Sequence, residues 1–183
     1  MKIAVYGSSS PRPGDPFYEQ AYRLGELLGQ GGHTVLTGGY QGTMEAVSKG
    51  ASEKGAHVIG VTSAEIERWE SSRRLNAWVS EERHAETLAQ RLDMLVRGSE
   101  ASIALPGGVG TLTEILFTWN HLVIHAIPPR PLVLIGEGWR DTLAQFIRAQ
   151  DAHLSVEEVN LLSFVPDVES AVQEVFEMSH HEH

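Results

Sequence analysis

The 183-residue sequence contains no cysteine. Disulfide bonds, thiol nucleophiles and thiolate metal ligands are therefore excluded. Cysteine-free chains need no oxidising compartment, and we expect the protein to be cytoplasmic. Long apolar runs are also missing, since no stretch reaches the roughly 20 residues that span a bilayer. We therefore expect no membrane partner.

Positive charge is scarce. Lysine and arginine together number 14 against 24 aspartates and glutamates, which leaves a formal net charge of −10. A general nucleic-acid binder needs a basic footprint for the phosphate backbone, so this balance argues against nucleic acid as a partner. A local basic pocket for one small anion remains compatible with it.

The length suits one domain with a sizeable core. No interdomain linker or internal repeat divides the chain, and we predict a single domain over residues 1–179. Residues 2–6 form a strand-like stretch at the very start, so we expect no signal peptide. We interpret residues 180–183 (HHEH) as a disordered His-rich tail, and we predict no metal site.

Strand-like apolar runs alternate with helical periodicity along the chain. We predict strands over residues 2–6, 33–37, 57–62, 101–105, 131–135 and 161–165, and helices over residues 17–30, 43–54, 81–98, 111–125, 139–150 and 167–178. This alternation predicts an α/β fold: a Rossmann-like, doubly wound, mainly parallel sheet with helices on both faces. Residues 63–80 follow neither pattern, and we interpret them as a solvated loop, with a lid or partner surface as the alternative.

A glycine-rich turn, residues 105–114 (LPGGVGTLTE), joins a predicted buried strand to a predicted helix. Its glycines allow positive φ and a close approach of the backbone to a ligand. The first amides of a helix have no intrahelical acceptor, and the helix dipole adds partial positive charge there. The turn therefore predicts an anion site, with the carboxylate of Glu114 beside it. A structural alternative exists, because Thr111–Glu114 also fits a capping box.

Two further small-residue turns follow predicted strands, at residues 7–10 and 38–44. In a doubly wound sheet all three turns share the carboxyl edge of the strands, where ligands bind. The chain has neither the dinucleotide spacing GxGxxG nor a Walker A lysine, which leaves a mononucleotide or a sugar phosphate. The predicted nucleotide-binding residues are Gly7, Ser8, Ser9, Gly38, Gly39, Gly42, Thr43, Met44, Pro106, Gly107, Gly108, Val109, Gly110 and Thr111.

Arg91 is a further candidate. On a helical wheel for residues 81–98 it flanks the apolar stripe that contains Leu88, Leu92 and Leu95, and His84 lies on the same flank. A residue on this flank can reach a cleft at the edge of the core. The alternative is a solvated arginine whose stem packs on apolar surface.

Residues 106–114 (PGGVGTLTE), with Arg91 fifteen residues before Pro106, resemble the LOG ("lonely guy") family of phosphoribohydrolases. The resemblance runs from residue 2 to about residue 165 and includes the turns at residues 7–10 and 38–44. It implies a Rossmann-like homodimer with sites near the interface and no cofactor. It also implies a catalytic pair, Arg91 and Glu114, that cleaves a nucleoside monophosphate.

The resemblance implies hydrolysis of the N-glycosidic bond of a purine nucleoside 5′-monophosphate, of cytokinin type in the plant members, to free base and ribose 5-phosphate. Two positions depart from the plant pattern. Leu92 stands where that pattern has lysine, and residues 42–45 read GTME instead of GLMG. Both departures resemble a branch that includes molybdenum-cofactor carriers. A non-catalytic carrier of a nucleotide or of this cofactor is therefore the alternative.

Relatives are also labelled lysine decarboxylases. A pyridoxal-phosphate enzyme needs a buried lysine for its Schiff base. The chain has only Lys2, Lys49 and Lys54, all at positions expected to be exposed, so the sequence argues against that chemistry.

Overall fold

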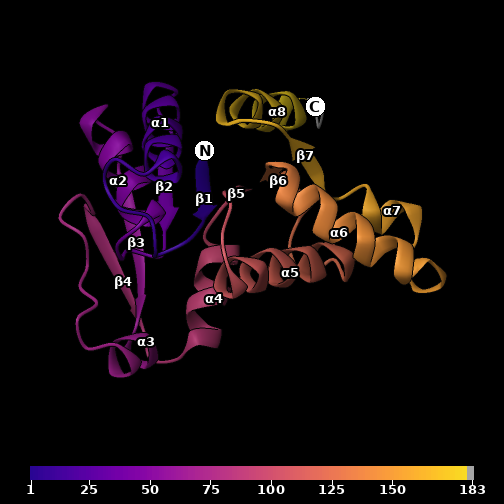
Figure 1. Ribbon diagram of the computed structural model, residues 1–183, viewed down its shortest axis with the longest axis horizontal. Helices are drawn as coiled ribbons and strands as arrows, with labels where there is room; N and C mark the ends of the chain where they lie inside the picture. The colour runs from indigo at the N-terminus through magenta and orange to yellow at the C-terminus, as the bar shows by residue number, and fades with distance from the viewer. Residues whose placement is uncertain (181–183) are drawn as a thin grey trace.

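The computed structural model describes residues 1–180. Seven strands form one parallel sheet in the spatial order β4-β3-β2-β1-β5-β6-β7 (Figure 1). The strands are β1 (Lys2–Tyr6), β2 (Thr34–Thr37), β3 (Val58–Ser63), β4 (Glu81–Ala85), β5 (Ala101–Ala104), β6 (Leu132–Ile135) and β7 (Ser163–Val165). The predicted Rossmann-like, doubly wound fold is confirmed, with every strand pair parallel.

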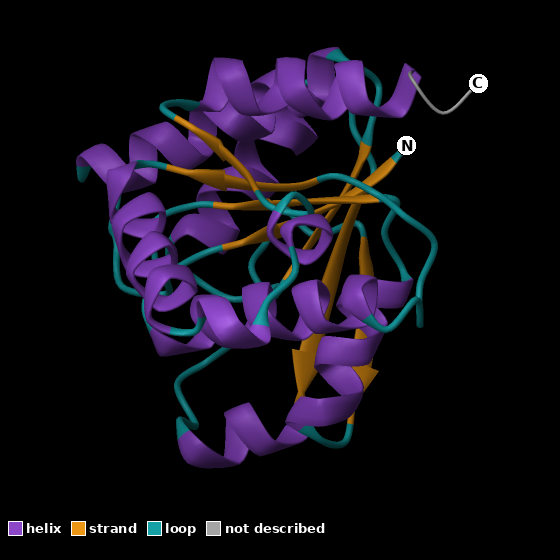
Figure 2. Cartoon of the chain, turned by 90° about the vertical axis from the view of Figure 1, so that its right-hand side faces the viewer, coloured by secondary structure: helices purple, strands orange, loops and turns teal. Residues whose placement is uncertain are grey.

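Helices cover both faces of the sheet (Figure 2). They are α1 (Pro16–Gln30), α2 (Thr43–Glu53), α3 (Ala64–Trp69), α4 (Leu88–Arg97), α5 (Val109–Val123), α6 (Glu137–Ala149), α7 (Val156–Val159) and α8 (Val168–His180). The predicted tail begins within α8, and residues 181–183 lie outside the described part. None of the helices within residues 1–180 is long and apolar enough to cross a membrane.

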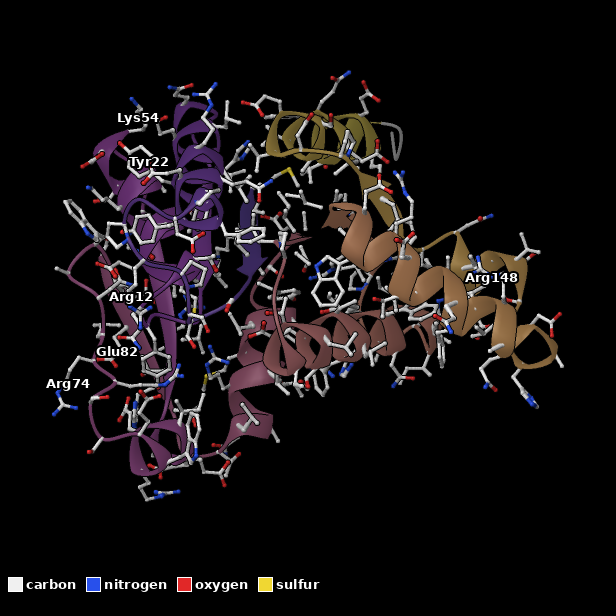
Figure 3. The ribbon with its side chains drawn as sticks, viewed as in Figure 1. Arg12, Tyr22, Lys54, Arg74, Glu82 and Arg148 are labelled. Atoms are coloured by element: carbon white, nitrogen blue, oxygen red, sulfur yellow. The ribbon has the colours of Figure 1, made fainter. Side chains whose placement is uncertain are left out.

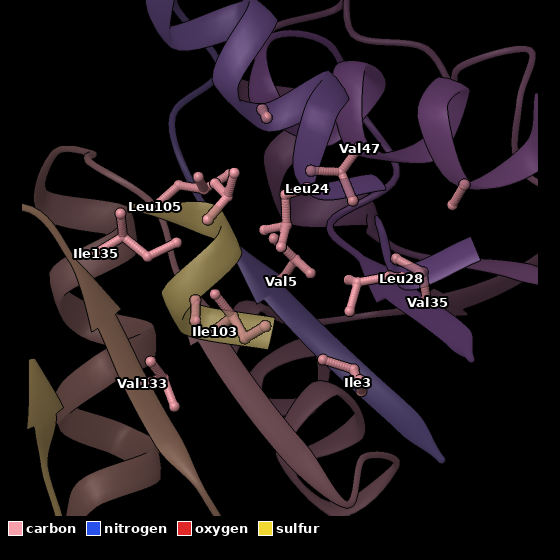
Figure 4. Close-up of a cluster of buried hydrophobic side chains, with 14 of the residues drawn as sticks. Ile3, Val5, Leu24, Leu28, Val35, Val47, Ile103, Leu105, Val133 and Ile135 are labelled. Atoms are coloured by element: carbon pink, nitrogen blue, oxygen red, sulfur yellow. The ribbon is translucent and has the colours of Figure 1, made fainter. Parts of the chain in front are cut away.

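Every strand except the edge strand β4 contributes to two separate cores, because successive side chains point to opposite faces. In β1, Ile3 and Val5 pack on the face that α1, α2 and α8 cover (Figure 4). Ala4 and Tyr6 pack on the other face, with residues of α4, α5 and α6. Because both faces are covered, the strands read as continuous apolar runs.

The predicted helix over residues 81–98 is wrong in its first part. Residues Glu81–Ala85 form the edge strand β4, and α4 starts only at Leu88. Thr87 and Gln90 form a capping box that defines the helix start. Charged residues are common on exposed edge strands, and here they hide the strand pattern. His84 therefore lies on the strand β4 and not on the helix that we predicted for residues 81–98.

Residues 63–80 are more ordered than a solvated loop. They contain α3, and the chain after α3 packs back over the second glycine-rich turn. The Nδ2 atom of Asn76 donates hydrogen bonds to the carbonyl oxygens of Gly39 (3.1 Å) and Tyr40 (3.0 Å). This segment therefore lies beside the carboxyl edge of the sheet.

Candidate active site

The strand order reverses between β1 and β5, which makes their carboxyl ends the switch point of the sheet. The turns after β1, β2 and β5 meet there, as the sequence predicts. Thr43 ties two of them together: its amide and its hydroxyl donate hydrogen bonds of 2.8 and 3.0 Å to the carbonyl oxygen of Ser8.

These turns border a cavity of about 390 Å³. Amides and hydroxyl groups of the turns after β1 and β5 line one part, whereas apolar side chains of α3 and α4 line another. The lining residues are Gly7, Ser8, Ser9, Ser10, Tyr40, Met44, Ile66, Trp69, Arg73, Leu88, Arg91, Leu92, Gly108, Val109, Gly110, Thr111, Thr113 and Glu114. The cavity thus offers both anion-binding groups and an apolar surface for a ring.

Eight of the predicted nucleotide-binding residues line the cavity, and so do Arg91 and Glu114. The other six are Gly38, Gly39, Gly42, Thr43, Pro106 and Gly107, which are outside the lining. Several of these act as supports. A Cβ atom on Gly42 would overlap the Ser8 carbonyl oxygen, and one on Gly107 would overlap the hydroxyl of Thr111.

Positive φ occurs at glycines of the turn after β2, and not at those of the turn after β5, where we predicted it. Gly39 (+77°) and Gly42 (+76°) adopt this conformation, both in the turn after β2. Gly107, Gly108 and Gly110 do not, so the turn after β5 uses glycine for close packing and for access to its backbone.

Arg91 and Glu114 form a buried ion pair at the cavity. The Nη1 atom of Arg91 lies 3.3 Å from Oε1 of Glu114, and its Nε donates a 2.7 Å hydrogen bond to the Val61 carbonyl oxygen. The two residues are only 5% and 8% exposed. Helices α4 and α5 therefore place both charges where water is largely excluded. This excludes the solvated-arginine interpretation of Arg91.

The capping-box interpretation of Glu114 is wrong. Helix α5 starts at Val109 and has Gly108 as its N-cap, with no side-chain cap. Glu114 therefore lies in the second turn, where a carboxylate cannot cap the helix. Its side chain contacts Arg91 instead.

Burial raises the pKa of Glu114 to about 7, against the opposing attraction and hydrogen bond of Arg91. A carboxyl group with this pKa holds a proton in part of the molecules at neutral pH and can both accept and donate one. Such tuning is typical of catalytic acids and bases, although structural ion pairs also produce it.

This pKa predicts a pH-dependent stability. Below about pH 7 the native state retains the Glu114 proton, whereas the unfolded chain releases it near the ordinary value of 4.5. The wild type therefore loses stability as the pH rises from about 4.5 to about 7. Glu114→Gln lacks this titration, so between pH 5 and pH 8 we expect its stability relative to the wild type to rise by about 1–3 kcal/mol. Urea unfolding of both proteins at the two pH values measures this change, and a stability difference that is the same at pH 5 and pH 8 contradicts the assignment.

Sequence reasoning missed Tyr40, Ile66, Trp69 and Arg73 as cavity residues. Trp69 and Arg73 belong to the segment 63–80, whose aromatic and arginine content was the available signal. Tyr40 lies within the second turn, and its ring is buried. Its hydroxyl accepts a 2.8 Å hydrogen bond from the Ser63 amide, which fixes the ring at the cavity wall.

One group of side chains within residues 1–180 brings three metal-ligating atoms within 4.8 Å of one another: Glu67, Glu82 and His84. These groups already bind neighbours. The Thr62 hydroxyl lies 2.7 Å from Oε1 of Glu82 and 2.9 Å from Nδ1 of His84. The group does not line the cavity, and we assign it no metal.

A doubly wound sheet with a cavity at its switch point is the arrangement of Rossmann-like proteins, in which ligands typically bind at this place. The chain matches the family model described as "Possible lysine decarboxylase" over residues 44–175. It is also 32% identical to the cytokinin riboside 5′-monophosphate phosphoribohydrolase LOG4 of Arabidopsis thaliana, over 97% of this chain and 83% of that protein. The chain therefore belongs to the LOG family.

A second relative is the probable cytokinin riboside 5′-monophosphate phosphoribohydrolase LOGL5 of Oryza sativa subsp. japonica. It is 35% identical over 80% of this chain, and the match spans 58% of the rice protein. Among solved structures, the molybdenum cofactor binding protein of Rippkaea orientalis has a TM-score of 0.74 at 23% identity, over 97% of this chain and 96% of that one. The molybdenum cofactor carrier protein of Chlamydomonas reinhardtii has a TM-score of 0.69 at 23% identity, over 96% and 97% of the two chains. These structures share the fold.

The three lysines do not fit the chemistry in the family description. Lys2 is exposed, and Lys54 lies directly after the end of α2 (Figure 3), where its ammonium pairs with Glu26 of α1 at 3.0 Å. Lys49 is half-buried and not exposed as predicted, and its ammonium lies 5.6 Å from the ring centroids of Tyr22 and Trp78. None of them lines the cavity, so no lysine is placed to form a Schiff base there.

Proposed function

We propose that the protein hydrolyses the N-glycosidic bond of a purine nucleoside 5′-monophosphate to give free base and ribose 5-phosphate. The observation that carries this proposal is the buried Arg91–Glu114 pair at a cavity with backbone amides in one part and apolar side chains in another. The family supports it, because the curated relatives are named as phosphoribohydrolases of cytokinin riboside monophosphates.

In this proposal the 5′-phosphate binds the amides of residues 107–111 at the start of α5, together with the hydroxyls of Ser8, Ser9 and Thr111. A helix N-terminus suits such an anion. The apolar side chains of α3 and α4 hold the base. Leu92 belongs to this apolar part, where the plant pattern would place a lysine.

Cleavage passes through a sugar with oxocarbenium character, by analogy with glycoside hydrolysis. The Glu114 carboxylate stabilises the positive charge at C1′ and takes a proton from the attacking water. The water oxygen forms a bond to C1′ while the base leaves with the electron pair of the broken C–N bond, and the base takes up one proton in place of the one that water gives to Glu114. Arg91 orients the nucleotide and keeps Glu114 ionised in part of the molecules against the effect of burial.

An assay for released base tests the proposal. Purified protein is incubated with AMP, GMP, IMP and CMP, and the free base is measured by HPLC. We expect release from a purine nucleotide. Binding of nucleotide without release from any of the four would instead support the carrier alternative.

The position of Arg91 depends on Gly38. A Cβ atom at Gly38 would overlap Nη2 of Arg91 and the sulfur of Met44. We therefore expect Gly38→Ala to fold but to move the guanidinium away from Glu114, with base release reduced about tenfold or more. Gly138→Ala in α6 is the control, because its new Cβ meets no atom within 4 Å. Equal rates for the two variants contradict the role of this packing.

We also propose that the protein is a homodimer or a larger homo-oligomer. Helices α4 and α5 expose several large apolar side chains: Leu88, Met94, Leu116 and the adjoining Ile124 are 41%, 38%, 40% and 60% exposed. Exposed apolar clusters are typical of protein interfaces. We expect multi-angle light scattering at micromolar concentration to give at least twice the chain mass of 20.1 kDa. A purely monomeric species removes this proposal.

A further inference from the structure

Arg73 lies at the cavity but belongs to none of the three turns. It follows α3 in the segment 63–80, and its side chain is only 12% exposed. Its Nη2 donates a 3.1 Å hydrogen bond to the hydroxyl of Ser9, in the turn after β1. The guanidinium thus connects this outer segment to the proposed phosphate site.

Two aromatic rings hold the Arg73 guanidinium in place. Its central carbon lies 5.4 Å from the Trp69 ring centroid and 5.8 Å from that of Tyr40. The Tyr40 ring also faces Arg91, at 5.9 Å. Such stacking preorganises a planar cation with its donors directed outward. Tyr40 therefore lies near both arginines of the cavity.

The cavity needs a cation for an anionic substrate. Its charged lining residues are Arg73, Arg91 and Glu114. The charge of Arg91 is matched by Glu114 at 3.3 Å. The chain as a whole carries a net charge of −10, which repels a phosphate. Arg73 is the lining cation whose charge is not offset by another lining group.

The present partner of Arg73 is a carboxylate that faces solvent. Its Nε pairs with Glu70 at 2.6 Å, but the Glu70 side chain is 36% exposed and outside the cavity lining. Exposed ion pairs contribute little to stability, since water solvates the carboxylate when it is released. Hydrogen bonds between guanidinium and phosphate are stronger and frequently bidentate. A phosphate that reaches Arg73 can therefore replace Glu70 or share the guanidinium with it.

We propose that Arg73 binds the 5′-phosphate of the substrate and so makes the segment 63–80 a fourth part of the binding site. This inference rests on the proposed nucleotide-binding function, although not on turnover. According to this inference, Arg73 makes the protein bind a nucleotide more tightly than the corresponding nucleoside. Arg73 contributes binding energy, and the bond-breaking step belongs to Glu114.

The test compares two neighbouring arginines. Arg74 is exposed and points away from the molecule (Figure 3). Within residues 1–180 its side chain donates hydrogen bonds only to the backbone carbonyl oxygens of Ser71 and Arg73. Isothermal titration calorimetry with AMP and with adenosine is performed on Arg73→Gln, Arg73→Lys and Arg74→Gln. All carry Glu114→Gln, which removes turnover, and circular dichroism confirms folding.

We expect Arg73→Gln to weaken AMP binding about 10–100-fold and to leave adenosine binding unchanged, because one charge-assisted interaction with the phosphate is lost. Arg73→Lys should recover part of the AMP affinity, and Arg74→Gln should match its parent. If Arg73→Gln binds AMP as tightly as its parent, the inference is wrong while the proposed function stands. If the parent binds neither ligand, both are wrong.

Discussion

Glu114→Gln is expected to abolish base release while the protein still folds and binds nucleotide. Glutamine keeps the shape of the side chain and a hydrogen-bonding oxygen for Arg91. It can neither take a proton from water nor offset positive charge at C1′. Loss of a positioned general base reduces rates by about 10²–10⁴. The measurement is the kcat for base release by HPLC, together with AMP affinity by calorimetry.

Glu158→Gln is a matched control for this substitution. Glu158 is a true capping-box glutamate: it accepts a 2.7 Å hydrogen bond from the Ser155 amide at the start of α7. A glutamine serves as well in this position, so wild-type turnover is expected. Wild-type turnover in Glu114→Gln would show that Glu114 is structural and would remove the mechanism.

Glu114 and Glu158 show what a local sequence motif can and cannot predict. Both fit the motif S/T-x-x-E, and the prediction holds at Glu158, where the box is local. At Glu114 it fails because the N-cap of the helix is Gly108, three residues before the expected cap at Thr111. The partner of Glu114 is 23 residues away on α4, a tertiary contact that no local pattern encodes.

The fold was largely predictable because parallel strands buried on both faces leave continuous apolar runs. Residues 81–85 (EERHA) lack such a run. An edge strand is only partly buried, and its exposed positions tolerate charged side chains. The predicted position of His84 on a helix flank is wrong for the same reason, because the residue lies in the strand β4.

The segment 63–80 was missed for a similar reason. Its contacts with the turns after β1 and β2 are made by Arg73 and Asn76, at sequence separations of 64 and 37 residues. Polar side chains that bind distant backbone or hydroxyl groups leave no periodic signal in the sequence. From its composition we interpreted the segment as a solvated loop, with a lid or partner surface as the alternative, whereas Ile66, Trp69 and Arg73 line the cavity.

The two departures from the plant-type pattern acquire a physical meaning in the structure. Thr43 replaces a leucine, and its hydroxyl bonds the carbonyl oxygen of Ser8, which ties the first two turns together. Leu92 replaces a lysine and lines the cavity. With an apolar side chain at this position, the lining cations are Arg73 and Arg91. The proposed phosphate site therefore depends more strongly on Arg73.

A 5′-phosphate is expected to be required for turnover. In the proposed complex the phosphate is the only part of the substrate that engages the amides of residues 107–111 and the hydroxyls of Ser8, Ser9 and Thr111. Hydrogen bonds to a charged group contribute about 1.5–3 kcal/mol each. Two such bonds that persist in the transition state correspond to about 10²–10⁴ in kcat/KM, and we expect at least this preference for AMP over adenosine.

Thr111→Val probes the same site from the protein side. The Thr111 hydroxyl lies at the start of α5 in a residue only 2% exposed, and valine has nearly the same shape. Because valine lacks this donor, we expect kcat/KM for AMP to fall about tenfold or more while the slow reaction with adenosine is unchanged. Thr142→Val on α6 is the control, since Thr142 is exposed and lies outside the cavity lining. Comparable kcat/KM values for AMP and adenosine in the wild type would show that the phosphate does not bind at the start of α5.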